Sequence, residues 1–105
     1  MTHTIKLNIG LSRIDGGENS VPATIQALRS HGFTIRDFFR HVGSWNGSPE
    51  YTLVLVVETD SHDWRESIAN LASALNQECI ACICDGVGEL IPPVYSFDAS
   101  LFIQL

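Results

Sequence analysis

The sequence has few basic residues. Six Lys and Arg stand against twelve Asp and Glu in 105 residues, which gives a formal net charge of −6 at pH 7. Proteins that bind DNA, RNA or anionic lipid gain much of their affinity by neutralising phosphates with basic side chains. The composition therefore disfavours direct binding to nucleic acid and to a membrane surface.

Long hydrophobic runs are also missing. The longest, Leu53 to Val57, has the length of a strand, whereas a membrane-spanning helix needs about 18 or more apolar residues. The first residues of the chain do not form a charged segment followed by an apolar run and a cleavage site. The three cysteines are clustered within residues 79–84, and an odd, clustered count suits a reducing compartment better than a disulfide scaffold. We therefore expect a cytoplasmic protein without a membrane segment.

Recognisable catalytic and metal-binding motifs are absent from the sequence as well. It contains no G-x-S-x-G and no H-E-x-x-H, which are the spacings of common hydrolase and zinc sites. On a strand, Cys82 and Cys84 would share one face and Cys79 the other, so the three thiols would not converge on a metal ion. The sequence predicts no catalytic residue, no metal and no cofactor, although a site assembled across subunits would escape a search by spacing.

The charge that is present is unevenly distributed. Residues 1–44 hold five basic and three acidic residues, a net +2, whereas residues 45–105 hold one basic and nine acidic residues, a net −8. Such asymmetry indicates an interaction surface, although scattered acids would also serve solubility alone. The acidic residues expected to form this surface are Glu58, Asp60, Asp63, Glu66 and Asp85.

Alternating apolar residues predict a first strand over residues 5–11, and the next apolar spacing predicts a helix that Ser20 caps and Gly32 ends. Residues 34–43 fit either a strand or an amphipathic helix. We favour a strand with a bulge near Asp37, because the short connection to the clear strand over residues 51–58 predicts a hairpin.

The second half of the chain repeats this order of elements. Apolar residues at Trp64, Ile68, Leu71 and Leu75 predict a second helix, with Asp60 or Ser61 as its cap. A strand over residues 79–84, a turn and a short return over residues 89–91 follow. The order strand, helix, strand, strand, helix, strand predicts a ferredoxin-like α+β domain over residues 1–93, with two helices on one face of an antiparallel sheet and an extra C-terminal strand or hairpin.

The C-terminal segment, residues 94–105, is unusually apolar for the end of a chain. Burial of a large apolar side chain is worth about 1.5–3 kcal/mol, so we expect this segment to dock, either as a strand on its own sheet or exchanged with a second copy. Because two helices would cover only one face of the sheet, we also expect a homo-oligomer, such as a dimer. The docking residues are Leu101, Phe102, Ile103 and Leu105.

These observations favour a small non-enzymatic interaction protein that binds a basic partner protein through its acidic surface. By compositional analogy it would inhibit a nucleic-acid-handling complex, as phage-encoded anti-defence (anti-CRISPR-like) proteins do. The alternative is an oligomeric small-molecule-binding regulator with a ligand site between subunits. A small enzyme with Asp37 or His41 as acid or base has the least support. The residues expected to form the ligand site are Arg36, Arg40, His41 and Trp45.

Overall fold

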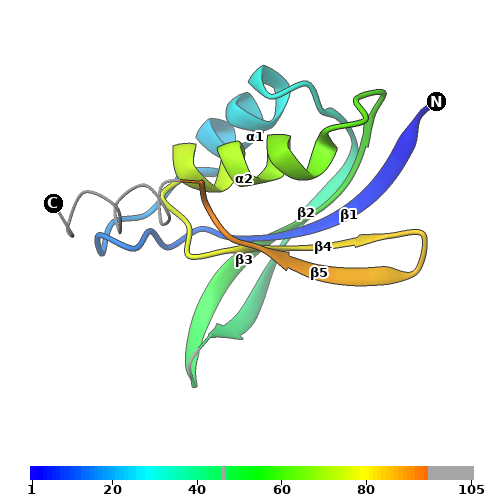
Figure 1. Ribbon diagram of the computed structural model, residues 1–105. Coiled ribbons are helices and arrows are strands. Elements are labelled where there is room, and N and C mark those ends of the chain that lie inside the picture. The colour runs from blue at the N-terminus through cyan, green and yellow to red at the C-terminus, as the bar shows by residue number, and fades with distance from the viewer. Residues whose placement is uncertain (46, 95–105) are drawn as a thin grey trace, which may run out of the picture.

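An antiparallel sheet of five strands forms one layer of the structure, and two helices lie together on one face of it (Figure 1). The computed structural model describes residues 1–45 and 47–94. The strand order is β2-β3-β1-β4-β5, and each neighbouring pair is antiparallel. The elements are β1 (His3–Gly10), α1 (Val21–Ser30), β2 (Thr34–Trp45), β3 (Ser48–Thr59), α2 (Trp64–Ala74), β4 (Ile80–Cys84) and β5 (Val87–Ile91).

The predicted α+β fold is confirmed, with β5 as an addition to the expected six elements. Strands β4 and β5 form a hairpin whose turn residues Asp85 and Gly86 both have positive φ, 53° and 79°. This is the backbone of a tight hairpin turn that matches the twist of its strands. The strand β5 therefore extends the sheet beyond β4, and the predicted extra hairpin lies at this edge.

The hydrophobic core lies between the sheet and the helices. Ile5, Leu7 and Ile9 of β1 have 0% exposure, as the period-two alternation predicts. They pack in one cluster with apolar residues of β3, α1 and α2, among them Ile68 and Leu71. The alternate residues of the central strands therefore point away from the helices, to a face of the sheet that no helix covers.

Helix α1 begins and ends as its sequence predicts. The Ser20 hydroxyl accepts a hydrogen bond from the Ala23 amide at 3.1 Å, which satisfies one of the free N–H groups of the first turn. After the helix, Gly32 has φ +87°, a conformation that favours glycine.

Replacing Ser20 by Ala is expected to lower the free energy of unfolding by about 1 kcal/mol, because the cap hydrogen bond is lost. Urea denaturation followed by circular dichroism measures the change. Ser30→Ala is the control, since the Ser30 hydroxyl donates only to the Gln26 carbonyl one turn earlier in the helix. Equal losses for the two variants would contradict the capping role.

Residues 34–43, which fitted two structures, belong to the 12-residue strand β2. The pairing of β2 with β3 shifts register between Ile35 and Asp37, so the predicted bulge is confirmed. After the bulge, Phe39 and His41 share the helix-free face of the sheet with Val54 and Thr52, the residues opposite them on β3. The bulge thus decides which side chains of β2 reach that face.

The predicted start of the second helix was wrong by one turn. Helix α2 begins at Trp64 with Asp63 as its cap residue, instead of Asp60 or Ser61. The Ser61 hydroxyl accepts a hydrogen bond from the Asp63 amide at 3.2 Å, so it organises the loop before the helix. Within the described residues, no helix is long and apolar enough to cross a membrane. The predicted docking residues Leu101, Phe102, Ile103 and Leu105 lie outside the described residues.

Candidate functional site

The helix-free face of the sheet holds a pocket of about 590 Å³, a size typical of small-molecule sites. Five of its lining residues, one from each strand, form a row across the sheet, because each lies opposite the next residue of the row in the strand pairing. This row is apolar apart from one amide, and its two ends are exposed, Phe39 to 56% and Leu90 to 64%. From edge to edge the row consists of Phe39, Val54, Asn8, Ala81 and Leu90.

A second row of residues, two positions further along each strand on the same face, is polar. His41 of β2 lies opposite Thr52 of β3, and Thr52 lies opposite Gly10 of β1. Beyond it, Glu50 of β3 lies opposite Gly43 of β2. The pocket therefore changes from apolar to polar along the strands.

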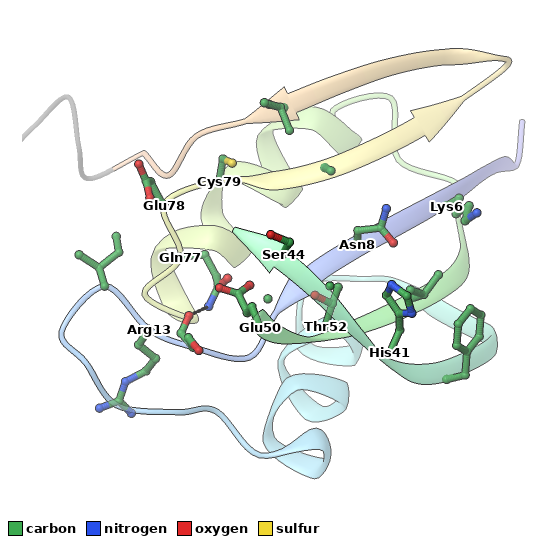
Figure 2. Close-up of a pocket in the computed structure, with 18 residues that line it drawn as sticks. Lys6, Asn8, Arg13, His41, Ser44, Glu50, Thr52, Gln77, Glu78 and Cys79 are labelled. Carbon is green, nitrogen blue, oxygen red and sulfur yellow. Dashed lines mark hydrogen bonds between the residues drawn. The ribbon is translucent and has the colours of Figure 1, made fainter. Parts of the chain in front are cut away.

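Gln77 closes the polar end of the pocket. It follows helix α2 and is only 4% exposed. Its side-chain Nε2 donates to the Ser12 carbonyl at 2.8 Å and to the Leu75 carbonyl at 3.4 Å. Because both bonds use the amide nitrogen, Oε1 is held as an acceptor on the pocket side. Figure 2 shows Gln77 and Glu50 close together at this end and His41 apart from them.

The carboxylate of Glu50 lies directly over Gly10. A Cβ built on Gly10 would overlap Oε1 of Glu50 and would lie 2.9 Å from its Cδ and 3.3 Å from Oε1 of Gln77. The two side-chain oxygens therefore face the same point of the pocket. Both are hydrogen-bond acceptors when Glu50 is ionised. We call these two residues the acceptor corner.

Glu50 has no hydrogen-bond or ion-pair partner among the residues that the structure describes. Partial burial raises the pKa of its carboxyl group, because it loses water without gaining a counter-charge. A half-buried carboxylate without a partner, directed into a pocket, is typical of a binding or catalytic site. The acceptor corner suits a positively charged group that donates hydrogen bonds.

The thiol of Cys79 lines the same pocket. Burial, together with the negative charges of Glu78 and Glu50, raises its pKa. A thiol with a raised pKa stays protonated at neutral pH and is a poor nucleophile. Cys82 and Cys84 lie on the core face of β4, so the predicted division of the cysteines between two faces is confirmed. Among residues 1–45 and 47–94, no group of His, Cys, Asp and Glu is arranged to hold a metal ion.

The structure separates the residues predicted to form a ligand site. His41 lines the pocket, but the guanidinium of Arg40 lies 5.3 Å from the centre of the Tyr51 ring on the other side of the sheet. Neighbouring residues of a strand point to opposite faces, so Arg40 and His41 do not face one ligand. Arg36 forms an ion pair with Glu58. Trp45 ends β2, and its side chain lies outside what the structure describes.

The residues of the predicted acidic surface lie at the ends of several elements. Glu58 is engaged by Arg36 near the end of β3, and Asp60 accepts a hydrogen bond from the Thr2 hydroxyl at 2.7 Å. Asp63 and Glu66 belong to the start of α2, and Asp85 belongs to the β4–β5 turn. None of the five lines the pocket described above. Binding of a basic partner protein and self-association remain untested predictions.

Sequence reasoning missed the residues that the pocket brings together. Glu50, Gln77 and Asn8 are not among the site residues that the sequence predicts. One signal was available: β1 alternates its buried residues with Lys6, Asn8 and Gly10, so its other face is polar or without a side chain. A polar face on a central strand indicates that this side of the sheet is not packed against a helix and is open to solvent or a ligand.

The fold and site define a small α+β protein with a ligand-sized pocket on the helix-free face of its sheet. This fold is similar to that of a phage SAM lyase in complex with S-methyl-5'-thioadenosine, with a TM-score of 0.52 and 12% identity over 87% of this chain and 89% of that chain. It is also similar to a phage SAM lyase in the apo state, with a TM-score of 0.55 and 14% identity over 88% and 90%. The sequence itself matches no family model and no curated protein.

These similarities correct the function predicted from composition. The prediction of a non-enzymatic interaction protein is contradicted, because the two solved structures named above are those of an enzyme. The regulatory alternative was non-enzymatic as well and is corrected with it. The reason for the error is physical: composition reports the charge of a surface, whereas a catalytic pocket depends on a few residues from distant segments.

Proposed function

We propose that this protein is a lyase that cleaves S-adenosylmethionine, or a closely related sulfonium nucleoside, and releases S-methyl-5'-thioadenosine. The observation that carries the proposal is the acceptor corner of Glu50 and Gln77 at the polar end of the pocket, in a fold shared with a phage SAM lyase. The shared fold alone would not carry it, because one fold supports many functions.

The charge of the substrate supports this assignment. At one end of the molecule S-adenosylmethionine carries a sulfonium and an α-ammonium group, both positive, and one α-carboxylate, so this end has a net positive charge. The acceptor corner offers a carboxylate without a counter-ion and an amide oxygen held in place. Charge-assisted hydrogen bonds of this kind are about twice as strong as neutral ones. We assign the cationic amino-acid end of the substrate to this corner.

The apolar row suits the other end of the substrate. Val54 and Ala81 offer a flat apolar floor between the exposed side chains of Phe39 and Leu90, and Asn8 lies in the middle of the row. Aromatic and apolar side chains bury the faces of a nucleobase, and a single amide fixes its orientation. We assign the adenosine end of the substrate to this row.

The bond that breaks follows from the product. S-Methyl-5'-thioadenosine keeps the sulfur, so the bond between sulfur and Cγ of the methionyl group breaks and its electron pair stays on sulfur. A lyase adds no water, so the four-carbon fragment either loses a Cβ proton to Glu50 or closes on its own carboxylate. The first route yields an unsaturated amino acid and the second a lactone, and each balances atoms and charge without an oxidant or reductant.

Incubation of the purified protein with S-adenosylmethionine tests the proposal. We expect S-methyl-5'-thioadenosine to accumulate with time in proportion to protein concentration, as measured by liquid chromatography, and Glu66→Gln on the exposed face of α2 to leave the rate unchanged. Substrate deuterated at Cβ separates the two routes, because only proton loss removes a deuteron. Absence of product formation, with no binding of S-methyl-5'-thioadenosine by calorimetry at millimolar concentration, would refute the proposal.

A further inference from the structure

We propose that Gly10 is a positioning residue, whose missing side chain provides the space in which the Glu50 carboxylate lies. The inference rests on the proposed function, because it assigns Gly10 a role in the same acceptor corner. It goes beyond that function because it assigns a role in the site to a residue of β1. Glycine has no side chain that could contact the substrate, so its chemistry alone does not indicate such a role.

The backbone does not require glycine at this position. The φ angle of Gly10 is not positive. Gly10 ends the regular pairing of β1 with β3, in which it lies opposite Thr52. A glycine within a strand destabilises the fold relative to alanine, since it loses more freedom on folding and packs no side chain. Its presence in a central strand therefore indicates a close approach by another group.

The approaching group is the end of the Glu50 side chain. A Cβ on Gly10 would overlap Oε1 of Glu50, and the next nearest atoms would be Cδ of Glu50 at 2.9 Å and Oε1 of Gln77 at 3.3 Å. Glu50 lies two residues before Thr52 in β3 and is a diagonal neighbour of Gly10 on the helix-free face. Its carboxylate crosses from β3 onto the backbone of β1.

An alanine at position 10 would thus act on Glu50 and leave the fold in place. The conflict is with the far end of a flexible side chain, which moves by rotation about its own bonds, and the three nearest atoms all belong to side chains. The carboxylate would swing out of the acceptor corner and into water. Gln77 would remain, because its two hydrogen bonds are made to Ser12 and Leu75.

Gly10→Ala is expected to lower kcat/KM for S-adenosylmethionine by tenfold or more, with the circular dichroism spectrum unchanged. Gly88→Ala is the matched control: Gly88 lies in β5 on the same face, and an added Cβ would meet its nearest atoms only at 3.9 Å. A loss of the same size in the control, or no loss in Gly10→Ala while the wild type is active, would overturn the inference and leave the proposed function standing.

The conservative change Glu50→Asp distinguishes the positioning of Glu50 by Gly10 from a merely structural role of Gly10, because only positioning predicts that its effect on the rate depends on residue 10. Aspartate is one methylene shorter, so in the wild-type background it withdraws the carboxylate and lowers the rate. In the Gly10→Ala background it relieves the overlap, and we expect it to raise the rate severalfold. Such a reversal of sign demonstrates direct coupling of the two positions; additive losses would overturn the inference.

A further readout does not depend on turnover. The Glu50 carboxyl group can be titrated by carbon NMR in wild type and in Gly10→Ala, and we expect the midpoint to move to lower pH in the variant as the carboxylate enters water. If the wild type is inactive, the proposed function fails, and this titration still tests whether Gly10 positions Glu50. An unchanged midpoint would overturn the positioning role.

Discussion

Replacement of Glu50 by Gln is expected to reduce the turnover of S-adenosylmethionine about a hundredfold, the usual effect of removing one electrostatic contact from an active site. The same change is expected to raise the thermal midpoint of unfolding. Glutamine keeps the shape of the side chain but carries no charge to be buried. Opposite signs for activity and stability are typical of a residue retained for function.

The pKa of Glu50 determines how both effects depend on pH. Burial raises it above the ordinary value of 4.5 in the folded protein, so the folded state binds more protons than the unfolded state between the two values. Stability therefore decreases as pH rises through this window, and the full destabilisation is present above the folded-state pKa. We expect the stability gain of Glu50→Gln to be largest at neutral pH and to vanish once the wild-type carboxyl group is protonated.

The rate should follow the ionised form of the same group. Protonation removes the negative charge that faces the cationic substrate, so kcat/KM should fall on the acidic side with a midpoint above 4.5. Scanning calorimetry and a pH–rate profile measure the two quantities on the same samples. Glu66→Gln should leave the rate unchanged and should lower the thermal midpoint slightly, because Glu66 is an acidic residue in the first turn of α2. A destabilised Glu50→Gln variant with full activity would contradict the assignment of Glu50 to the site.

Gln77→Leu is expected to lose both stability and activity. The substitution leaves the Ser12 carbonyl without its 2.8 Å hydrogen bond and removes the one from the same amide to Leu75. An intramolecular hydrogen bond contributes about 0.5–1.5 kcal/mol to stability, and each kcal/mol lost lowers the thermal midpoint of a domain of this size by about 4–8 °C. Turnover should fall about tenfold or more, because the amide oxygen of the acceptor corner is also lost.

Gln26→Leu provides the control for this prediction, since Gln26 is exposed on helix α1. We expect its thermal midpoint and rate to stay close to those of the wild type. Thermal denaturation followed by circular dichroism, together with product formation at saturating substrate, compares the two variants. A Gln77→Leu protein as stable as the control would show that the hydrogen bonds to Ser12 and Leu75 contribute little.

Glu50→Gln and Gln77→Leu together separate two roles within one corner of the pocket. Glu50 has no partner among the described residues, so its removal relieves a burial penalty. Gln77 joins the segment after β1 to the segment after α2, so its removal weakens the fold. Loss of activity in both variants with opposite shifts in stability is the pattern that the structure predicts.

The elements of the fold could largely be predicted from local patterns. Ile5, Leu7 and Ile9 alternate with polar residues, and this period alone places them on the buried face of a strand. The bulge near Asp37 also followed from the sequence, through the hairpin that the next strand implied. These predictions succeed because each depends on residues close together in the chain.

The start of α2 could not be predicted from local sequence patterns alone. Asp60, Ser61 and Asp63 are all acceptable cap residues by type, and the choice among them depends on where β3 ends and how the loop packs. Arg40 and His41 of the predicted ligand site are adjacent in sequence, but their side chains lie on opposite sides of the sheet, as neighbours on a strand do.

The sequence by itself determined an acidic α+β domain with a buried face of alternating apolar residues and a second face left polar and without helices. Only the tertiary structure decided that this second face is hollow and that Glu50 and Gln77 meet above Gly10. The physical reason is that these residues belong to three distant segments. Their meeting depends on the register between β1 and β3 and on the connection after α2, and both are set by packing across the whole domain.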